Sequence, residues 1–573
     1  MAESYFLLAA TFIPLLLAPV AYGIGRKVGV NAATWFSFGA LAVSTGLLLI
    51  PAMGIYSGQQ EVYMESYTWG QFGDFGLRLD GLSLPFALII YILCTVLALY
   101  SKPYMVHKVS EDLPEHKSGH GSGGPSTHGS DPGSQGGSPN VSGSQLTVLE
   151  TDQRVKNQIG LYFSLYLAFS MGMLGTVLST NLIEFYVFFE LMLVPSFFMI
   201  AFYGYGARRR IALMFFFWTH VGAVVLLLGL LAMGFFAGGF DFDTIRANAA
   251  NIPAQWLPLI IFALVLGLGV KLAAFLLHIW LPYAHAEAPT PVSALLSPAM
   301  IGIGAYGLLR LWMELLTGSY EQYSLYINMW GLATMIYGGA MALMQDDIKR
   351  VLAYSSISQM GYILFGLGSE SVLGITGGTL MYVTHGLGKA ILFMMAGSII
   401  LQTGTRSMAK LGGLAGKMPY TAVLAMIGAL TIIGIPPTSG FMGEWILFNG
   451  VLQTAKAEMD PVRTTMFALG ILATVLSSAY ILWMYKRIFF GKIPEELAHV
   501  KDSNRYITAT MGVFAAMTLI IGVYPDIFLN PINDYIGGMF EDQEGVLPVP
   551  VHAEGSGQLT NLSPLVSVED GEH

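Results

Sequence analysis

Long apolar runs constrain the fold of this chain more than any other feature of its sequence. About fourteen runs are long enough to cross a bilayer, at about 20 residues per helical crossing. Hydrophobic residues make up 54% of the chain and charged residues 11%, whereas soluble domains contain about 25% charged residues. Inside a bilayer, every backbone polar group must be bonded within the protein. The sequence therefore predicts an all-α polytopic membrane protein with about 14 transmembrane helices.

The distribution of basic residues predicts the orientation of these helices. Of the 27 Lys and Arg residues, 20 lie in loops that follow odd-numbered runs and 4 in loops that follow even-numbered runs. Cytoplasmic loops of membrane proteins carry the excess of positive charge. We therefore expect the odd-numbered loops in the cytoplasm and both termini outside. The first run has an acidic rather than a basic front end, which indicates a retained helix and not a cleaved signal.

The apolar runs divide the chain into six expected segments. Three helices come first, followed by a cytoplasmic insert, two five-helix units, a last transmembrane helix and a polar external tail. These segments are 1–106, 107–157, 158–315, 325–490, 500–541 and 542–573.

Small residues fill the predicted insert. Between 118 and 144, 20 of 27 residues are Gly, Ser or Pro. Such a composition cannot bury a core and predicts a flexible linker. The alternative is a metal-binding role for four histidines, although their spacing is irregular and no carboxylate or cysteine pattern accompanies them. These histidines are His107, His116, His120 and His128.

Two of the apolar runs are interrupted in a similar way. The seventh, 256–288, carries Lys271 near its middle and then meets several histidines and prolines. The twelfth, 419–450, is interrupted by a Pro-Pro pair and continues to Glu444. Prolines are tolerated at membrane depth where neighbouring helices or water satisfy the freed backbone groups. Interrupted helices at corresponding positions, five helices apart, predict two inverted repeats, each with a broken helix.

Ionisable residues inside the apolar runs are the candidate functional residues. A charged side chain in a bilayer is costly and normally faces protein or a water-filled path. His385 and Lys389 lie four residues apart and so share one helix face. Histidine titrates near neutral pH, and buried Lys and Glu can be shifted toward it. We therefore predict a proton relay. Its residues are Glu190, Lys271, His278, His385, Lys389 and Glu444.

Each of these residues also has a simpler interpretation. A buried glutamate can be neutral and hydrogen-bonded to a neighbouring helix, and each histidine can contact a backbone carbonyl. His220 and Glu314 have no other candidate relay residue near them in the sequence, and we expect them to make only local contacts. A metal site formed by His278, His285 and Glu287 is disfavoured, because prolines and a change of backbone direction separate these residues.

At these residues the chain resembles the antiporter-like subunits of respiratory complex I, and most closely the chain M type. Related chains occur in archaeal deazaflavin-cofactor dehydrogenases, membrane-bound hydrogenases and multisubunit sodium/proton antiporters. The resemblance covers nearly the whole chain apart from the insert and the tail. It implies two inverted five-helix repeats with two broken helices. The most specific stretches are NLIEFYVFFELMLVPSFFMI, HIWLPYAHAEAPTPVSALLS with GAYGLLR behind it, and GFMGEW.

The resemblance also implies roles for individual residues. Glu190 matches a glutamate that pairs with the lysine of the broken seventh helix, which is Lys271 here. His385 matches a histidine of the eleventh helix, and Glu444 matches the terminal acid of the twelfth.

One position departs from the family pattern. Chain M usually carries a lysine in the eighth helix, and this chain has Gly302 at the aligned position. Our own inference is that Lys389, one turn from His385, supplies the missing base.

We therefore expect a proton-translocating membrane subunit of a complex I-like oxidoreductase, driven by redox chemistry in partner subunits. The chain has a single cysteine and no glycine-rich nucleotide motif. No cofactor or metal is expected in it, and flavin and iron–sulfur clusters are expected in partner subunits. The expected setting is a multisubunit complex in a prokaryotic plasma membrane, with neighbouring antiporter-like subunits and no nucleic acid. The alternatives are a subunit of a multisubunit sodium/proton antiporter or membrane-bound hydrogenase and, more remotely, a stand-alone secondary transporter.

Overall fold

The computed structural model describes residues 5–70, 73–112, 152–457 and 459–541. Most of the predicted insert and all of the predicted tail lie outside these residues. In the described part, ten helices are long and apolar enough to cross a membrane. Two shorter apolar helices, Leu257–Leu272 and Pro419–Ile433, precede the two predicted interruptions. The prediction of a polytopic helical membrane protein is therefore confirmed.

Three long helices and a hairpin form the first part of the chain. The hairpin strands pair antiparallel, from Tyr63 opposite Leu79 to Thr68 opposite Asp74. The prediction of an all-α fold missed this hairpin. Each strand has only six residues, too few for a clear alternation of apolar and polar residues next to the long apolar runs. The elements are α1 (Phe6–Lys27), α2 (Val30–Tyr56), β1 (Tyr63–Thr68), β2 (Asp74–Leu79) and α3 (Ser83–Glu111).

The next part contains the first broken helix and two irregular spans. The predicted fifth span consists of two helices that meet at Met192, and the predicted eighth contains two π-helical segments, η3 and η4. The elements are α6 (Gln153–Leu178), α7 (Leu182–Leu191), α8 (Leu193–Tyr203), α9 (Arg208–Ala237), α10 (Phe242–Asn248), α11 (Leu257–Leu272), α12 (Trp280–Glu287), α13 (Thr290–Leu295), η3 (Leu296–Met300), α14 (Ile303–Gly307) and η4 (Leu308–Glu314).

The last part contains the second broken helix. The predicted final helix, 500–541, is found as two helices separated at Tyr524 and Pro525, where proline cannot continue the preceding helix. The elements are α15 (Tyr320–Leu343), α16 (Ile348–Leu367), α17 (Val372–Thr403), α18 (Pro419–Ile433), α19 (Ser439–Ala457), α20 (Pro461–Phe489), α21 (Arg505–Val523) and α22 (Asp526–Glu541).

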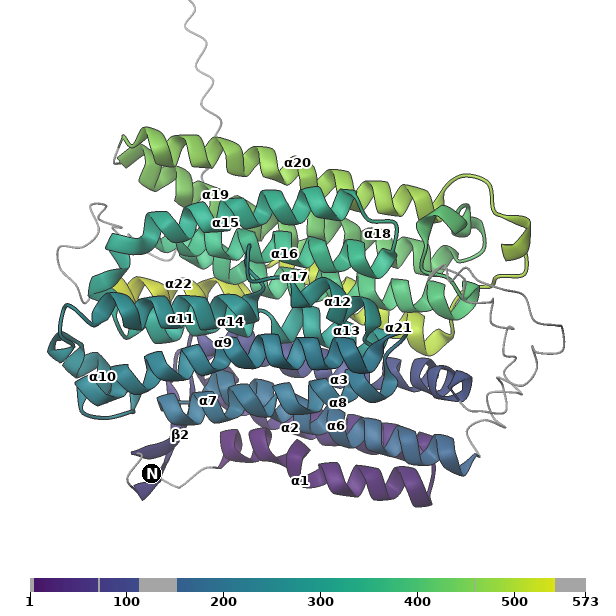
Figure 1. Ribbon diagram of the computed structural model, residues 1–573, viewed down its shortest axis with the longest axis horizontal. Helices are drawn as coiled ribbons and strands as arrows, with labels where there is room; N and C mark the ends of the chain where they lie inside the picture. Colours follow the sequence, from purple (N-terminus) through teal and green to yellow (C-terminus); the bar gives the residue numbers. More distant parts are fainter. Residues whose placement is uncertain (1–4, 71–72, 113–151, 458, 542–573) are drawn as a thin grey trace, which may run out of the picture.

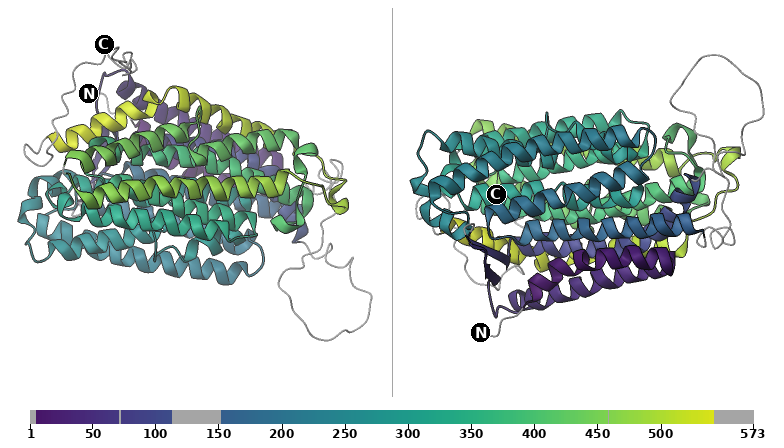
Figure 2. Two further views of the ribbon diagram at one scale, coloured as in Figure 1. Left: turned by 90° about the horizontal axis from the view of Figure 1, so that it is seen from above. Right: turned by 60° about the horizontal axis from the view of Figure 1, so that its bottom comes forward.

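The long helices run roughly side by side, with α1 and α2 at one edge of the bundle and α20 at the opposite edge (Figures 1 and 2). Helix α17 lies in the interior, where it packs against α3, α13, α16, α18, α19 and α21. This helix carries His385 and Lys389, so both residues reach the centre of the protein.

Contacts between loops show that the chain alternates between the two ends of the bundle. At one end, the hairpin residue Leu77 pairs with Ser179, and Asn181 pairs with Asp241. At the other end, Asp347 pairs with Ser407. The loops that follow even-numbered runs thus meet one another, and so do the loops that follow odd-numbered runs. We call these the hairpin end and the far end.

Side chains stabilise the first break by binding backbone groups that leave the helix. Helix α11 ends where Ala273 adopts a left-handed conformation with φ 57°. The indole N–H of Trp280 then donates to the Val270 carbonyl at 2.8 Å, and that of Trp330 donates to the Phe275 carbonyl at 2.9 Å. The break is therefore a packed feature in which indole groups bind two of its backbone carbonyls.

Candidate functional site

Lys271 lies in the last turn of α11, immediately before the first break. Its side chain is buried, and Nζ lies 4.5 Å from the centre of the Phe189 ring on α7. An ammonium over an aromatic face is attracted by the ring but keeps no formal counter-ion. The structure thus holds a buried lysine at a helix break, and no carboxylate of the described residues contacts it directly.

Glu190 follows Phe189 on α7 and binds a different partner from the one expected. Its Oε2 lies 2.9 Å from Nδ1 of His220 on α9, while Oε1 is buried without a hydrogen-bond partner in the described part of the chain. Glu190 and Lys271 are close enough to interact electrostatically, but no ion pair within 4.0 Å joins these two described residues. The direct pairing implied by the family resemblance is therefore not seen in this structure.

His385 and Lys389 share one face of α17, as predicted. Lys389 Nζ donates to the Leu352 carbonyl at 3.1 Å and to the Ser355 hydroxyl, both on α16. Both ring nitrogens of His385 are buried without a hydrogen-bond partner among the described residues. Buried polar groups that lack protein partners are typical places for ordered water or for groups with a functional role.

The structure adds two residues to this group that the sequence analysis did not assign to it. His285 on α12 stacks on Phe393 of α17 at 5.3 Å, is close enough to interact electrostatically with His385 and Lys389, and also has both ring nitrogens unpartnered in the described chain. Lys349 is fully buried in the first turn of α16, where Nζ donates to the Ala288 carbonyl. Lys349 is followed directly by Arg350 in the sequence, so no isolated charge in an apolar run marks it, and only the tertiary structure shows its burial.

Glu444 lies beside the second break, between α18 and α19. Gly434 at this break has φ 75°, and a Cβ added there would meet the Glu444 carboxylate. The side chain is 9% exposed, and its Oε1 has no hydrogen-bond partner in the described residues. Each break therefore has a buried ionisable side chain at a helix end beside it, Lys271 at the first and Glu444 at the second.

His278 is placed apart from the other predicted relay residues. It lies in the first break, and its Nε2 is 3.1 Å from the Tyr337 hydroxyl on α15. The structure gives it no contact with Lys271 or Glu190. The described residues also contain no group of three His, Cys, Asp or Glu side chains that could hold a metal ion.

The structure explains why a long side chain is missing at Gly302. A Cβ added to Gly302 would overlap the ring of Tyr382 on α17. That ring is fixed by stacking on Phe86, with ring centres 4.2 Å apart. An aromatic side chain therefore fills the space that a lysine would occupy here.

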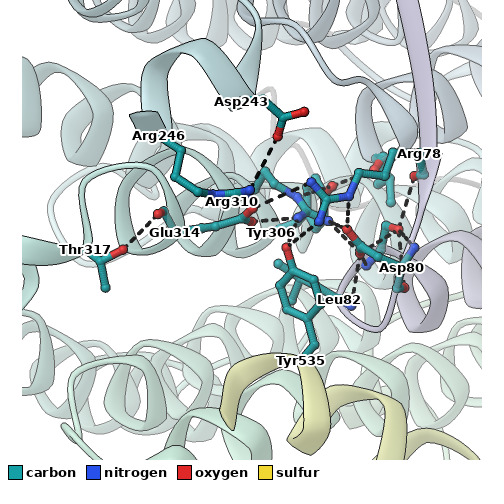
Figure 3. A network of polar contacts seen from close by, with 12 residues as sticks. Arg78, Asp80, Leu82, Asp243, Arg246, Tyr306, Arg310, Glu314, Thr317 and Tyr535 are labelled. Carbon is teal, nitrogen blue, oxygen red and sulfur yellow. Dashed lines mark hydrogen bonds and ion pairs between the residues drawn. The ribbon is translucent and has the colours of Figure 1, made fainter. Parts of the chain in front are cut away.

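A separate network of charges lies at the hairpin end (Figure 3). Arg310 donates to both carboxylate oxygens of Asp80, at 2.7 and 2.8 Å, and to Glu314 at 2.6 Å. Arg78 lies 2.8 Å from Asp80, and Tyr535 of α22 accepts from Arg310 at 2.5 Å. Glu314 thus makes the expected contact with Arg310 one turn away, but it also binds Arg246 of α10, which the expectation of only local contacts did not include. The network joins the hairpin, η4 and α22.

Asp80 precedes the membrane-spanning helix α3. Burial disfavours its charge, but the guanidinium groups of Arg310 and Arg78 and a hydrogen bond from Ser83 outweigh burial and hold the pKa of Asp80 well below its usual range. Asp80 therefore remains ionised at any physiological pH.

Similarity to known proteins agrees with these features. Residues 179–485 match the family described as NADH:quinone oxidoreductase/Mrp antiporter, TM. NADH-quinone oxidoreductase subunit M of Rickettsia typhi is 34% identical over 66% of this chain and 75% of its own length. F(420)H(2) dehydrogenase subunit M of Methanosarcina mazei is 35% identical over 65% of this chain and 74% of its own length.

A solved structure shows the same fold. A chain of respiratory complex I from Thermus thermophilus superposes with a TM-score of 0.73, at 23% identity, over 93% of this chain and 99% of its own. The match of the family over more than half of the sequence includes α7, both broken helices and α17. The chain therefore belongs to the NADH:quinone oxidoreductase/Mrp antiporter transmembrane family.

Proposed function

We propose that this chain is a proton-translocating subunit of a complex I-like oxidoreductase complex. The observation that carries the proposal is a series of buried ionisable side chains that begins at one helix break, passes the central helix α17 and ends at the other break. Membrane proteins rarely keep such groups without a partner unless they serve transport. The relatives named as subunits of NADH-quinone oxidoreductase and F(420)H(2) dehydrogenase support a redox partner.

The proposed path has three stations. Lys271, influenced by Glu190, forms the first station. His385, Lys389 and His285 form the second, in which Lys389 takes the place of the family's missing lysine. Glu444 forms the last station before the outer side. We further propose about fourteen membrane crossings, two inverted repeats, and both termini outside the plasma membrane of a prokaryote.

The proposed driving step is a change in the Glu190–Lys271 interaction. A conformational or electrostatic signal from the neighbouring subunit weakens this interaction, so that the Lys271 ammonium gives up its proton. The proton passes along water to His385 and Lys389, and Lys271 is refilled from the cytoplasm. Moving one charge across 100 mV costs about 2.3 kcal/mol, so a modest change at each station is sufficient.

Partner subunits complete the proposed assembly. They hold the flavin and iron–sulfur clusters, because Cys94 is the chain's one cysteine and such clusters need several thiolates. The alternative is a subunit of a multisubunit sodium/proton antiporter, which the same family description includes.

The test is to extract the native assembly in mild detergent, reconstitute it in vesicles and supply an electron donor. We expect flavin, iron–sulfur clusters and proton movement that depends on electron transfer to a quinone or phenazine. A colourless set of small hydrophobic subunits that exchanges sodium for protons would favour the antiporter. Activity of the isolated chain would contradict both.

A further inference from the structure

His220 touches the carboxylate of the proposed gate, although the proposed path makes no use of it. Its Nδ1 lies 2.9 Å from Glu190 Oε2, and its ring stacks on Phe216 with the ring planes 13° apart. The His220 side chain is 42% exposed and that of Glu190 is 20% exposed. The contact therefore lies on the face of α7 and α9 that points away from the bundle, beside the exposed apolar residues Phe217 and Val221.

Lys271 approaches the same part of α7 from another direction. Its Nζ rests on the ring of Phe189, the residue before Glu190. Consecutive helical side chains diverge by about 100°, so Phe189 meets α11 while Glu190 meets α9. Glu190 thus has two basic side chains near it, Lys271 within electrostatic range and His220 in direct contact.

We propose that His220 is a positioning residue that competes with Lys271 for the carboxylate of Glu190. When Glu190 binds His220, Lys271 has no direct counter-ion and releases its proton. When Glu190 leaves His220, it stabilises the Lys271 ammonium. The unpartnered Oε1 of Glu190 leaves one oxygen available for this second partner. This inference rests on the proposed function, because it needs Glu190 and Lys271 to form the gate.

The test measures donor-driven proton translocation by the whole complex, per assembled complex, in a double-mutant cycle. We expect His220→Leu to lower the rate about tenfold, which corresponds to about 1.4 kcal/mol, because Glu190 then stays with Lys271. In a Glu190→Gln background the same change should add no further loss, since His220 acts only through Glu190. His220→Lys, which again places a basic side chain beside Glu190, should restore most of the rate, and the exposed His499→Leu is the matched control.

Two results would overturn this inference alone. In the first, the His220→Leu complex pumps at the wild-type rate while the Glu190→Gln complex is defective. In the second, His220→Leu causes the same loss of rate whether residue 190 is Glu or Gln. If His220→Leu does not assemble, His220→Gln takes its place, because its amide keeps a hydrogen-bond donor but cannot carry a positive charge. Normal translocation by Glu190→Gln itself would overturn the proposed gate as well.

Discussion

The buried charges at the hairpin end and those in the middle of the bundle differ in how fully they are paired. At the hairpin end, Arg310 contacts two carboxylates and two tyrosine hydroxyls, and Asp80 contacts two arginines. In the middle, His285 and His385 have no hydrogen-bond partner among the described residues, and Lys389 has only neutral oxygens.

This difference separates charges that hold the structure from the residues that we propose to serve transport. A buried charge is tolerated in a stable structure when it is paired and hydrogen-bonded. A buried group without a partner costs stability, so its presence needs another reason. The network of Arg310 therefore fixes the hairpin, η4 and α22 together, while the central residues have no charged partner in the described part of the chain that fixes them in the same way.

The largest predicted effect comes from breaking the paired network. Arg310→Met leaves Asp80 buried without its bidentate partner, and we expect a loss of about 3–5 kcal/mol of stability. The measurement is the melting temperature and yield of the assembled complex, with the exposed Arg209→Met as the control. The double variant Asp80→Leu/Arg310→Met should recover part of the loss, since both charges are then removed. A complex as stable as the wild type with Arg310→Met alone would refute the structural role.

The central residues should respond in the opposite way. Lys389→Met replaces a buried ammonium by an apolar side chain of similar length, so we expect stability to be unchanged or higher. Proton translocation through this subunit should fall about a hundredfold or more, the size of effect typical of a lost proton-transfer group. Both quantities are measured on the same reconstituted complex. If Lys389→Met lowers the stability of the complex as much as Arg310→Met does, the distinction between the two regions is wrong.

The low pKa of Asp80 predicts how the stability of the hairpin end depends on pH. Because this pKa is lower in the folded protein than its usual value of 3.8, the ionised pair stabilises the fold at higher pH and is lost as pH falls below that value. The difference in melting temperature between wild type and Asp80→Asn should therefore be constant from about pH 8 to pH 5 and shrink below about pH 4. A difference that changes between pH 5 and pH 8 would assign the effect to another group.

A smaller effect is expected from the contact between the hairpin and α1. Glu65 accepts the N–H groups of Leu7 and Leu8, at 2.9 Å each, and so acts like a cap on α1. Glu65→Gln keeps the shape and removes the charge, and we expect a cost of about 1 kcal/mol. Thermal unfolding of the complex measures it, with the exposed Glu495→Gln as a matched control.

The smallest effect is expected from deleting residues 118–144, which lie outside the described part of the chain. Their composition predicts a linker, so assembly and proton translocation should remain at wild-type levels. Loss of either, measured on a native gel and in vesicles, would assign the segment a role of its own.

Composition and residue pattern predicted the membrane class, both broken helices and the residues beside them. Lys271 and Glu444 stand out in the sequence because ionisable residues are rare in apolar runs. Lys349 and the contact of His220 with Glu190 were not predictable in this way. Lys349 is next to other charged residues, and whether it is buried depends on how α16 packs.

The partners of charged residues also depend on the tertiary structure. The sequence places Arg310 and Glu314 one turn apart, but Asp80 and Tyr535 come from distant segments that only the fold brings to them. The contact between Gly302 and the ring of Tyr382, which occupies the space beside the glycine, is likewise not predictable from the sequence.

The most direct test of the account is proton translocation by the native complex with Lys271→Met. The exposed Lys417→Met serves as the control, and donor-driven electron transfer and proton uptake are measured in the same vesicles. The account predicts an assembled complex whose translocation through this subunit is lost with Lys271→Met and kept with Lys417→Met. A Lys271→Met complex that moves as many protons per electron as the wild type would contradict it.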